Sequence, residues 1–518
     1  MAIAHRGRRA IARRRIIIPF IILAGLIAAL HFSAPDLIDH RLRKWVANLA
    51  PGISAEWRSL EILPFSPGIR FREARIQWKN PREPDTTIHF TSEILDIGGI
   101  DLAALLLAGN FRAEEVRIRD WTCSVKGRIG DILSGGYSGD SSQSMPVHRW
   151  KIENGTFSWS EGRDNLGGAE ARLESLVFSK KNPGNTTRMT HLSAGAVRIG
   201  FPAAMADVTV EKITFNRKKG NLKVMDLVMK PRWSEREFGL RKGFQTDRVG
   251  FHIREMTVAW QGESGGLPEW TPHLIELRNP RLEIFRDRRV HRKSGMPKRK
   301  SSPFRILQQF PFRIHALQIR IHNGDIHYAE QQPGARSPGR LWFSRLSARI
   351  TGFQAGPVEP GSSHPIHMGF TCRFQGDIPF SGDFDMHTGR PDFRFSGKLG
   401  AVELPVLNSL LIPMAFLRID TGKMDGARWN LVGNDNHLQG WMQAKYGKLR
   451  LTLLKHREPP QKRGLATFLV NLLILRNNPE KGEPLRRAHI HLERNPTRGF
   501  FNWVWRGLLE GLKRSAGI

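Results

Sequence analysis

The chain has 518 residues, of which 40% are hydrophobic, so it holds enough apolar side chains for two or three compact domains or one elongated one. Its 80 Lys and Arg residues outweigh 48 Asp and Glu residues, which gives a formal net charge of +32 at pH 7. Only two cysteines are present, Cys123 and Cys372, and this excludes a disulfide scaffold and a cysteine-based metal site.

The first hydrophobic stretch, residues 16–34, predicts a transmembrane anchor. It lacks Asp, Glu, Lys and Arg and is long enough for one helical crossing of a bilayer. Six arginines and no acidic residue precede it, so the N-terminus is expected to stay in the cytoplasm while the rest of the chain is exported. The side chains expected within the bilayer are Ile16, Ile17, Ile18, Phe20, Ile21, Ile22, Leu23, Leu26, Ile27 and Leu30.

A cleaved signal peptide is the alternative to an anchor. Cleavage after Ala34 or after Ser33 would place Phe32 or His31 at the third-last position, where a small residue is required. The sequence therefore favours an uncleaved anchor.

The exported part remains strongly basic. Subtracting the six leading arginines from +32 leaves +26. This charge indicates anionic partners in a cell envelope, such as phospholipid headgroups or acidic polymers. The predicted anchor places the body on the wrong side of the membrane for nucleic acid.

Short strands separated by turn residues dominate the chain after an amphipathic helix at 36–50 and a short apolar helix at 100–109. Few segments between the strands are long and helical enough for a crossover, so an antiparallel meander is expected. The clearest predicted strands cover residues 116–125, 208–215, 251–260, 391–396 and 448–453.

A repeated unit lies in this strand-rich body. KIENGTFSWSE at 151–161 matches RIHNGDIHYAE at 320–330, and looser copies begin at Arg117 and Glu276. Each is expected to be strand, tight turn, strand, because Asn-Gly suits a turn with positive φ. Apolar and polar residues alternate, so each sheet should have one apolar face. The candidate lipid-facing residues on it are Ile152, Phe157, Trp159, Ile321, Ile326 and Tyr328.

The C-terminal part is expected to contain helices. Residues 406–412 are leucine-rich, and residues 498–514 form an amphipathic helix with basic flanks that suits a bilayer interface. A helix capping the end of the sheet fits the same pattern. The candidate interfacial residues are Phe500, Phe501, Trp503, Trp505 and Leu508.

No catalytic motif is found, so we expect no enzyme, no cofactor and no metal. Metalloprotease, nucleophile-elbow and P-loop motifs are absent from the sequence. Ser138 lies among glycines without a strand–turn–helix context. His489 and His491 lack a nearby third ligand.

Two tracts resemble AsmA-like proteins. Residues 99–125 (GIDLAALLLAGNFRAEEVRIRDWTCSV) resemble their N-terminal signature, in which a Leu-rich piece is followed by Gly, a basic strand and a turn. Residues 406–455 resemble their C-terminal region, with Gly422, Gly426, Gly440, Tyr446 and the strand at 448–454 as marks. The ending RNPTRGFFNWVWRGLLEGLK is similar to the tail of some members.

The resemblance implies a single-pass inner-membrane protein with a periplasmic body. The fold expected from it is mainly β: a transmembrane helix, then an elongated, curved antiparallel sheet that forms a groove, with a few short helices. The expected segments are the anchor (1–35), an AsmA-like N-terminal region (36–130), a repetitive sheet body (131–400), an AsmA-like C-terminal region (401–480) and a terminal strand and helix (481–518).

The resemblance also implies non-enzymatic binding or transport of phospholipid between inner and outer membranes, in support of outer-membrane integrity. The alternative is a structural or assembly factor that binds anionic polymers or outer-membrane proteins. The strand pattern alone leaves a closed sandwich open, because an apolar face packs equally well against a second sheet.

Overall fold

The computed structural model divides into two compact units, Met1–Gly200 and Phe201–Ile518. It describes residues 38–40, 42–43, 52–63, 68–79, 86–100, 113–127, 147–161, 167–179, 188–201, 205–260, 269–291, 303–308, 313–356, 364–454, 475–496 and 499–517. The predicted anchor at 16–34 lies outside these ranges, as do Ser138 and nearly all of the helices expected at 36–50 and 100–109. Within the described ranges, no helix is long and apolar enough to cross a membrane.

The first unit is a sheet that begins with two short strands, β1 and β2, which pair one after the other with the same edge of β3. From there the strands pair in chain order from β3 to β8, all antiparallel except the parallel pair β5–β6. The strands are β1 (Ile53–Glu56), β2 (Ser59–Leu63), β3 (Gly68–Lys79), β4 (Thr87–Gly98), β5 (Ala113–Lys126), β6 (Val147–Glu161), β7 (Gly167–Ser179) and β8 (Arg188–Phe201).

The second unit is a sheet whose long strands also pair in chain order. They are β9 (Ala206–Asn216), β10 (Asn221–Pro231), β11 (Asp247–Ala259), β13 (Leu274–Asp287), β14 (Arg313–Gln331), β15 (Gly339–Ala355), β16 (Pro365–Phe374), β17 (Ile378–His387), β18 (Arg390–Leu399), β20 (Leu417–Gly433), β21 (His437–Leu453) and β22 (Ala488–Glu493). The two-residue strands β12 (Glu269–Trp270) and β19 (Val402–Glu403) pair with β14 and β20. Its helices are α4 (Glu235–Lys242), α5 (Pro303–Gln308), η2 (Leu404–Leu407), α6 (Asn408–Ala415) and α8 (Phe500–Ser515).

The mainly-β, mostly antiparallel class is therefore confirmed, and each strand predicted above coincides with an observed one. The helices expected at 406–412 and 498–514 are also present, as η2 with α6 and as α8. The sheet body is not antiparallel throughout, however. β5–β6 and β13–β14 run parallel, so the expectation of an antiparallel sheet across 131–400 is corrected at these pairs.

The prediction of Asn-Gly turns in the repeats is wrong. Asn154 (φ 49°) and Asn323 (φ 52°) each lie inside one continuous strand, β6 or β14. The neighbouring parallel strands carry Asp120 (φ 51°) and Asn279 (φ 50°) at the matching places. Asn and Asp tolerate the left-handed region better than most residues, so each is a single left-handed residue, here termed a bulge, in a strand that continues. The register of β6 with β5 and β7 is the same on both sides of Asn154, whereas β14 is irregularly paired with β15 near Asn323.

Each repeated unit is thus a parallel strand pair with its bulges side by side. In β13–β14, Asn323 Nδ2 donates a hydrogen bond to Asn279 Oδ1 at 2.7 Å. In β5–β6, the Trp121 ring covers Gly155, where an added Cβ would lie 1.9 Å from Trp121 Cε2. The glycine after Asn154 is therefore required by the close approach of an indole ring, and not by a turn.

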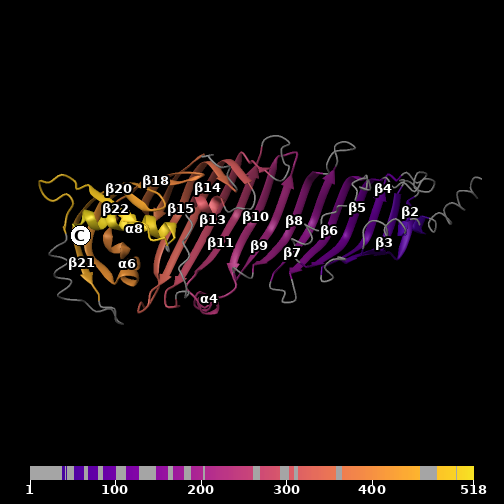
Figure 1. The fold of residues 1–518 in the computed structure, drawn as a ribbon, viewed down its shortest axis with the longest axis horizontal. Coiled ribbons are helices and arrows are strands. Elements are labelled where there is room, and N and C mark those ends of the chain that lie inside the picture. Colours follow the sequence, from indigo (N-terminus) through magenta and orange to yellow (C-terminus); the bar gives the residue numbers. More distant parts are fainter. Residues whose placement is uncertain are drawn as a thin grey trace, which may run out of the picture. The chain divides into compact units, whose positions relative to one another are not determined.

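Packed cores lie in different places in the two units. In the first unit, Ile38 and Leu42 are buried against strands β3 to β5 in one cluster. In the second unit, two core clusters contain residues of the strands from β15 through β22 together with residues of η2, α6 and α8. Figure 1 shows α8 lying against β21 and β22. Cys123 and Cys372 are free thiols, and burial raises the pKa of Cys372 to about 12.

Candidate functional site

The bulges keep apolar side chains on one face of the second unit. A strand that alternates strictly would send its apolar residues to opposite faces on either side of an inserted residue, and the one-residue bulge restores them to the same face. In β14, Ile319 and Ile321 precede Asn323, whereas Ile326 and Tyr328 follow it. The apolar positions change from odd to even residue numbers at Asn323, and their side chains therefore all point to the same face of the sheet.

Two cross-strand rows show this continuity. One row places Leu277, Ile321, Ala348 and Phe370 side by side on β13 to β16. The other places Leu282, Ile326, Phe343 and Phe374 on the same strands. Phe370 and Phe374 are four residues apart in β16, which pairs with β17 without any register shift, so they point to the same face. Both rows consequently belong to one apolar surface.

The first unit carries an equivalent face. Ile152 lies beside Ile118 and Leu176, Phe157 lies beside Cys123 and Ala171, and Trp159 lies beside Val125 and Ala169. Phe90 and Leu95 of β4, which continue two of these rows, pack against one core cluster. The six candidate residues of the repeats are all partly exposed.

Part of the second unit's apolar face lies outside the packed core clusters formed by the described residues. We call it the open apolar face and define it by ten partly exposed side chains of β10, β11, β13 and β14. These are Leu222, Met229, Phe251, Met256, Leu277, Leu282, Ile284, Ile321, Ile326 and Tyr328. Among the described residues, neither core cluster of this unit includes a member from β9 to β14. A contiguous exposed apolar surface of this kind is typical of a binding site.

The opposite face of both sheets is polar and carries cross-strand ion pairs. In the second unit, Lys223 pairs with Glu255 at 3.0 Å. In the first unit, Asp96 accepts hydrogen bonds from Arg70 Nε at 2.7 Å and Arg119 Nη2 at 2.9 Å. Burial alone would raise the pKa of the Asp96 carboxyl, but the two arginines hold it below its usual value. The sheets are therefore amphipathic, with one wet and one apolar side.

A buried polar cluster borders the open apolar face at the ends of β13 and β14. The Tyr328 hydroxyl donates to Glu330, which is 1% exposed and also pairs with Arg288. Arg286 pairs with Asp247 at 2.7 Å beside it. Burial and the Glu330 carboxylate raise the pKa of Tyr328, so its hydroxyl stays protonated. Sequence reasoning missed this cluster, since only the parallel register of β13 and β14 places Arg286 beside Glu330.

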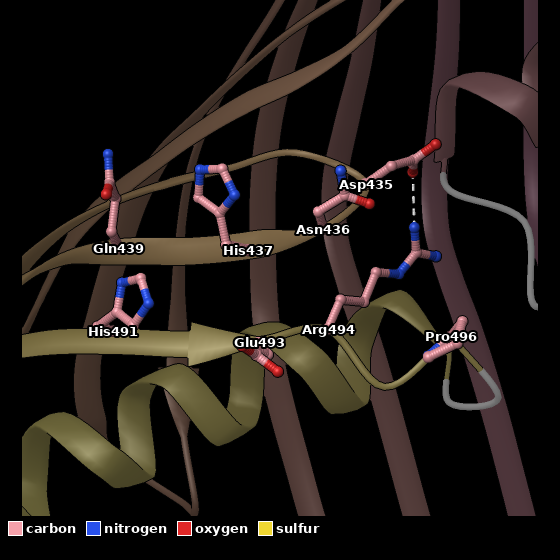
Figure 2. A pocket seen from close by; sticks show the side chains of 8 residues that line it. All are labelled: Asp435, Asn436, His437, Gln439, His491, Glu493, Arg494 and Pro496. Atoms are coloured by element: carbon pink, nitrogen blue, oxygen red, sulfur yellow. Dashed lines mark hydrogen bonds and ion pairs between the residues drawn. The ribbon is translucent and has the colours of Figure 1, made fainter.

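A polar hollow of about 630 Å³ lies where the β20–β21 turn meets the segment after β22. Figure 2 shows Arg494 reaching from this segment to Asp435, with Nη1 2.6 Å from Oδ1. The Arg494 guanidinium also lies 5.3 Å from the Trp503 ring centroid. These contacts fasten the turn to α8, so the charges of this hollow serve the packing of the end of the sheet.

His489 and His491 lie on β22 in the part of the chain that the structure describes. His491 lines the hollow of Figure 2 beside His437, whereas His489 lies beside Trp441. Within the described ranges, no group of three His, Cys, Asp or Glu side chains could hold a metal ion.

The candidate interfacial residues of α8 divide into buried and exposed sets. Trp503 is 4% exposed and Leu508 is 9% exposed, and both belong to a core cluster with β21 and β22 residues. Phe500 and Trp505 are partly buried against it. Phe501 is 84% exposed. The helix caps the sheet with most of its apolar side chains, and Phe501 is the member of the set that remains available to a bilayer.

No protein-family model matches the chain, and no curated protein matches its sequence.

Proposed function

We propose that the chain is a non-enzymatic envelope protein that binds or conducts phospholipid, with acyl chains lying on the open apolar face. The observation that carries this proposal is the pair of continuous apolar rows through Ile321 and Ile326, whose members on β13 and β14 lie outside the core clusters of the described residues. An acyl chain on such a surface is shielded from water, which is worth about 0.8 kcal/mol for each methylene buried.

The polar cluster at the end of the face fits this role. Arg286 and Arg288 lie beside Glu330, the carboxylate that accepts from the Tyr328 hydroxyl, at the boundary between apolar and charged side chains. A phospholipid has the same division between acyl chains and headgroup. Bulges also bend strands, so the left-handed residues would curve the sheet into a groove around its apolar side. The resemblance to AsmA-like proteins supports the same function, with an inner-membrane anchor, a periplasmic body and transport toward the outer membrane.

The test is to purify the full chain in mild detergent, extract it with organic solvent and measure phospholipid bound per chain. Ile326→Asp places a charge on the open apolar face, and His327→Asp, one residue away on the polar face, is the matched control. We expect phospholipid with the wild-type chain and with His327→Asp, and its loss with Ile326→Asp. No phospholipid with the wild type, or equal amounts with both variants, would contradict the proposal and favour a structural role.

A further inference from the structure

A second hollow, of about 500 Å³, lies on the polar face of β15 to β18. Thr371, Ser381 and Lys398 form one cross-strand row in it, and Arg373 follows two residues after Thr371. Arg345 sits in the β15 bulge between the pairs Ser344–Arg373 and Ser347–Thr371, with a left-handed φ of 50°. Because adjacent strands lie about 4.8 Å apart, the row from Thr371 to Lys398 spans roughly 10 Å, and Arg345 on β15 lies one strand farther from Lys398.

The hollow is positively charged without compensation. The hollow is lined by Arg345, Thr371, Arg373, Ser381 and Lys398 together with Cys372, Pro379, Phe380, Leu399 and Gly400, and none of these described residues is acidic. Arg373 Nη1 donates to the Asp377 carbonyl oxygen at 3.1 Å, which leaves its charge unneutralised. In contrast to the ion-paired arginines of the first unit, these three cations lie within ion-pair distance of no carboxylate among the described residues.

We propose that this hollow is an anion site that binds a phosphate group. Guanidinium groups donate paired hydrogen bonds to phosphate oxygens, an ammonium group adds a point charge, and hydroxyls complete the set of donors. Three cations around one hollow suit the double charge of a phosphate monoester better than a single carboxylate. This site is separate from the open apolar face and does not depend on the proposed lipid function.

The position of the hollow restricts the source of the phosphate. Lys398 and Leu399 are consecutive in β18, so their side chains point to opposite faces, and Leu399 packs against a core cluster. The Lys398 side chain therefore lies on the face opposite to the acyl chains proposed for the apolar face. The geometry points to a phosphate carried on a water-exposed molecule such as a phosphorylated saccharide.

The test is calorimetric titration of the full chain in detergent with inorganic phosphate and with glucose 6-phosphate. We expect both probes to bind, and Arg373→Gln and Lys398→Gln each to weaken binding at least tenfold. Lys398→Arg should restore most of the affinity. Arg349→Gln is the matched control, because it removes an exposed arginine of β15 that lies outside the hollow. Unchanged thermal melts establish that the variants are folded.

Two results would overturn the site. One is a loss of affinity in Arg373→Gln and Lys398→Gln no greater than in Arg349→Gln, which would mean general electrostatic attraction. The other is binding to vesicles of phosphatidylglycerol in phosphatidylcholine that depends on Lys398, with no binding of either soluble probe, which would assign the cations to a bilayer surface. Binding of the soluble probes that is lost with Lys398→Gln, with vesicle binding unaffected, would support it.

Discussion

Replacing Ile321 with Asp distinguishes an open face from a packed one. Ile321 is partly exposed between Leu277 and Ala348, so an aspartate there can turn its carboxylate toward water. The cost is the lost apolar contact of a half-buried side chain, about 1 kcal/mol. For comparison, Leu431 is 0% exposed in a core cluster. Leu431→Asp loses the buried side chain and leaves a buried carboxyl group, at about 5 kcal/mol or more.

These free energies correspond to clearly different melting temperatures. At about 3 °C for each kcal/mol, Ile321→Asp should lower the melting temperature by about 3 °C and Leu431→Asp by more than about 10 °C. Tryptophan fluorescence of the full chain during heating measures both. A fall for Ile321→Asp as large as that for Leu431→Asp would mean that a second layer packs on Ile321 and that the apolar face is not open there.

Three further predictions concern the strands. Gly155→Ala should lower the free energy of unfolding by about 1–3 kcal/mol, since its Cβ would lie 1.9 Å from the Trp121 ring, and Trp121→Leu in the same chain should recover most of this in urea unfolding. Asn323→Val should cost about 1–3 kcal/mol at a φ of 52°, whereas Asn323→Gly should cost less; equal costs would contradict a role for the left-handed backbone. Since the folded-state pKa of Asp96 is depressed, its stabilising contribution is present above the unfolded-state pKa of about 3.9 and is lost as the pH falls through the lower folded-state pKa, so the melting temperatures of wild type and Asp96→Asn should converge on acidification.

Period-two alternation identified the strands and the apolar face because burial on one side of a sheet imposes that period directly. It did not distinguish a turn from a bulge at Asn154 and Asn323, since both need one residue with positive φ. Only the pairing of each strand with its two neighbours, before and after the asparagine, shows that the strand continues past this residue. The parallel pairs were missed for a related reason: strand direction depends on partners far away in the sequence.

The role of α8 shows a second limit. A helix that lies on a bilayer and a helix that packs on a sheet have the same amphipathic pattern. The sequence therefore could not decide whether Trp503 faces lipid or the sheet. The structure buries Trp503 against the sheet and leaves Phe501 exposed. The cluster of Glu330 with Arg288 was likewise beyond sequence reasoning, because its members meet only through the pairing of β13 with β14.

Photo-crosslinking reports whether acyl chains lie on the open apolar face. A benzophenone amino acid placed at Leu282, on this face, is compared with one at Glu283, the next residue of β13 and an exposed member of the polar face. After irradiation in cells, mass spectrometry of the purified chain should show phospholipid adducts at position 282 and none at position 283. Adducts at neither position, or at both alike, would contradict the claim.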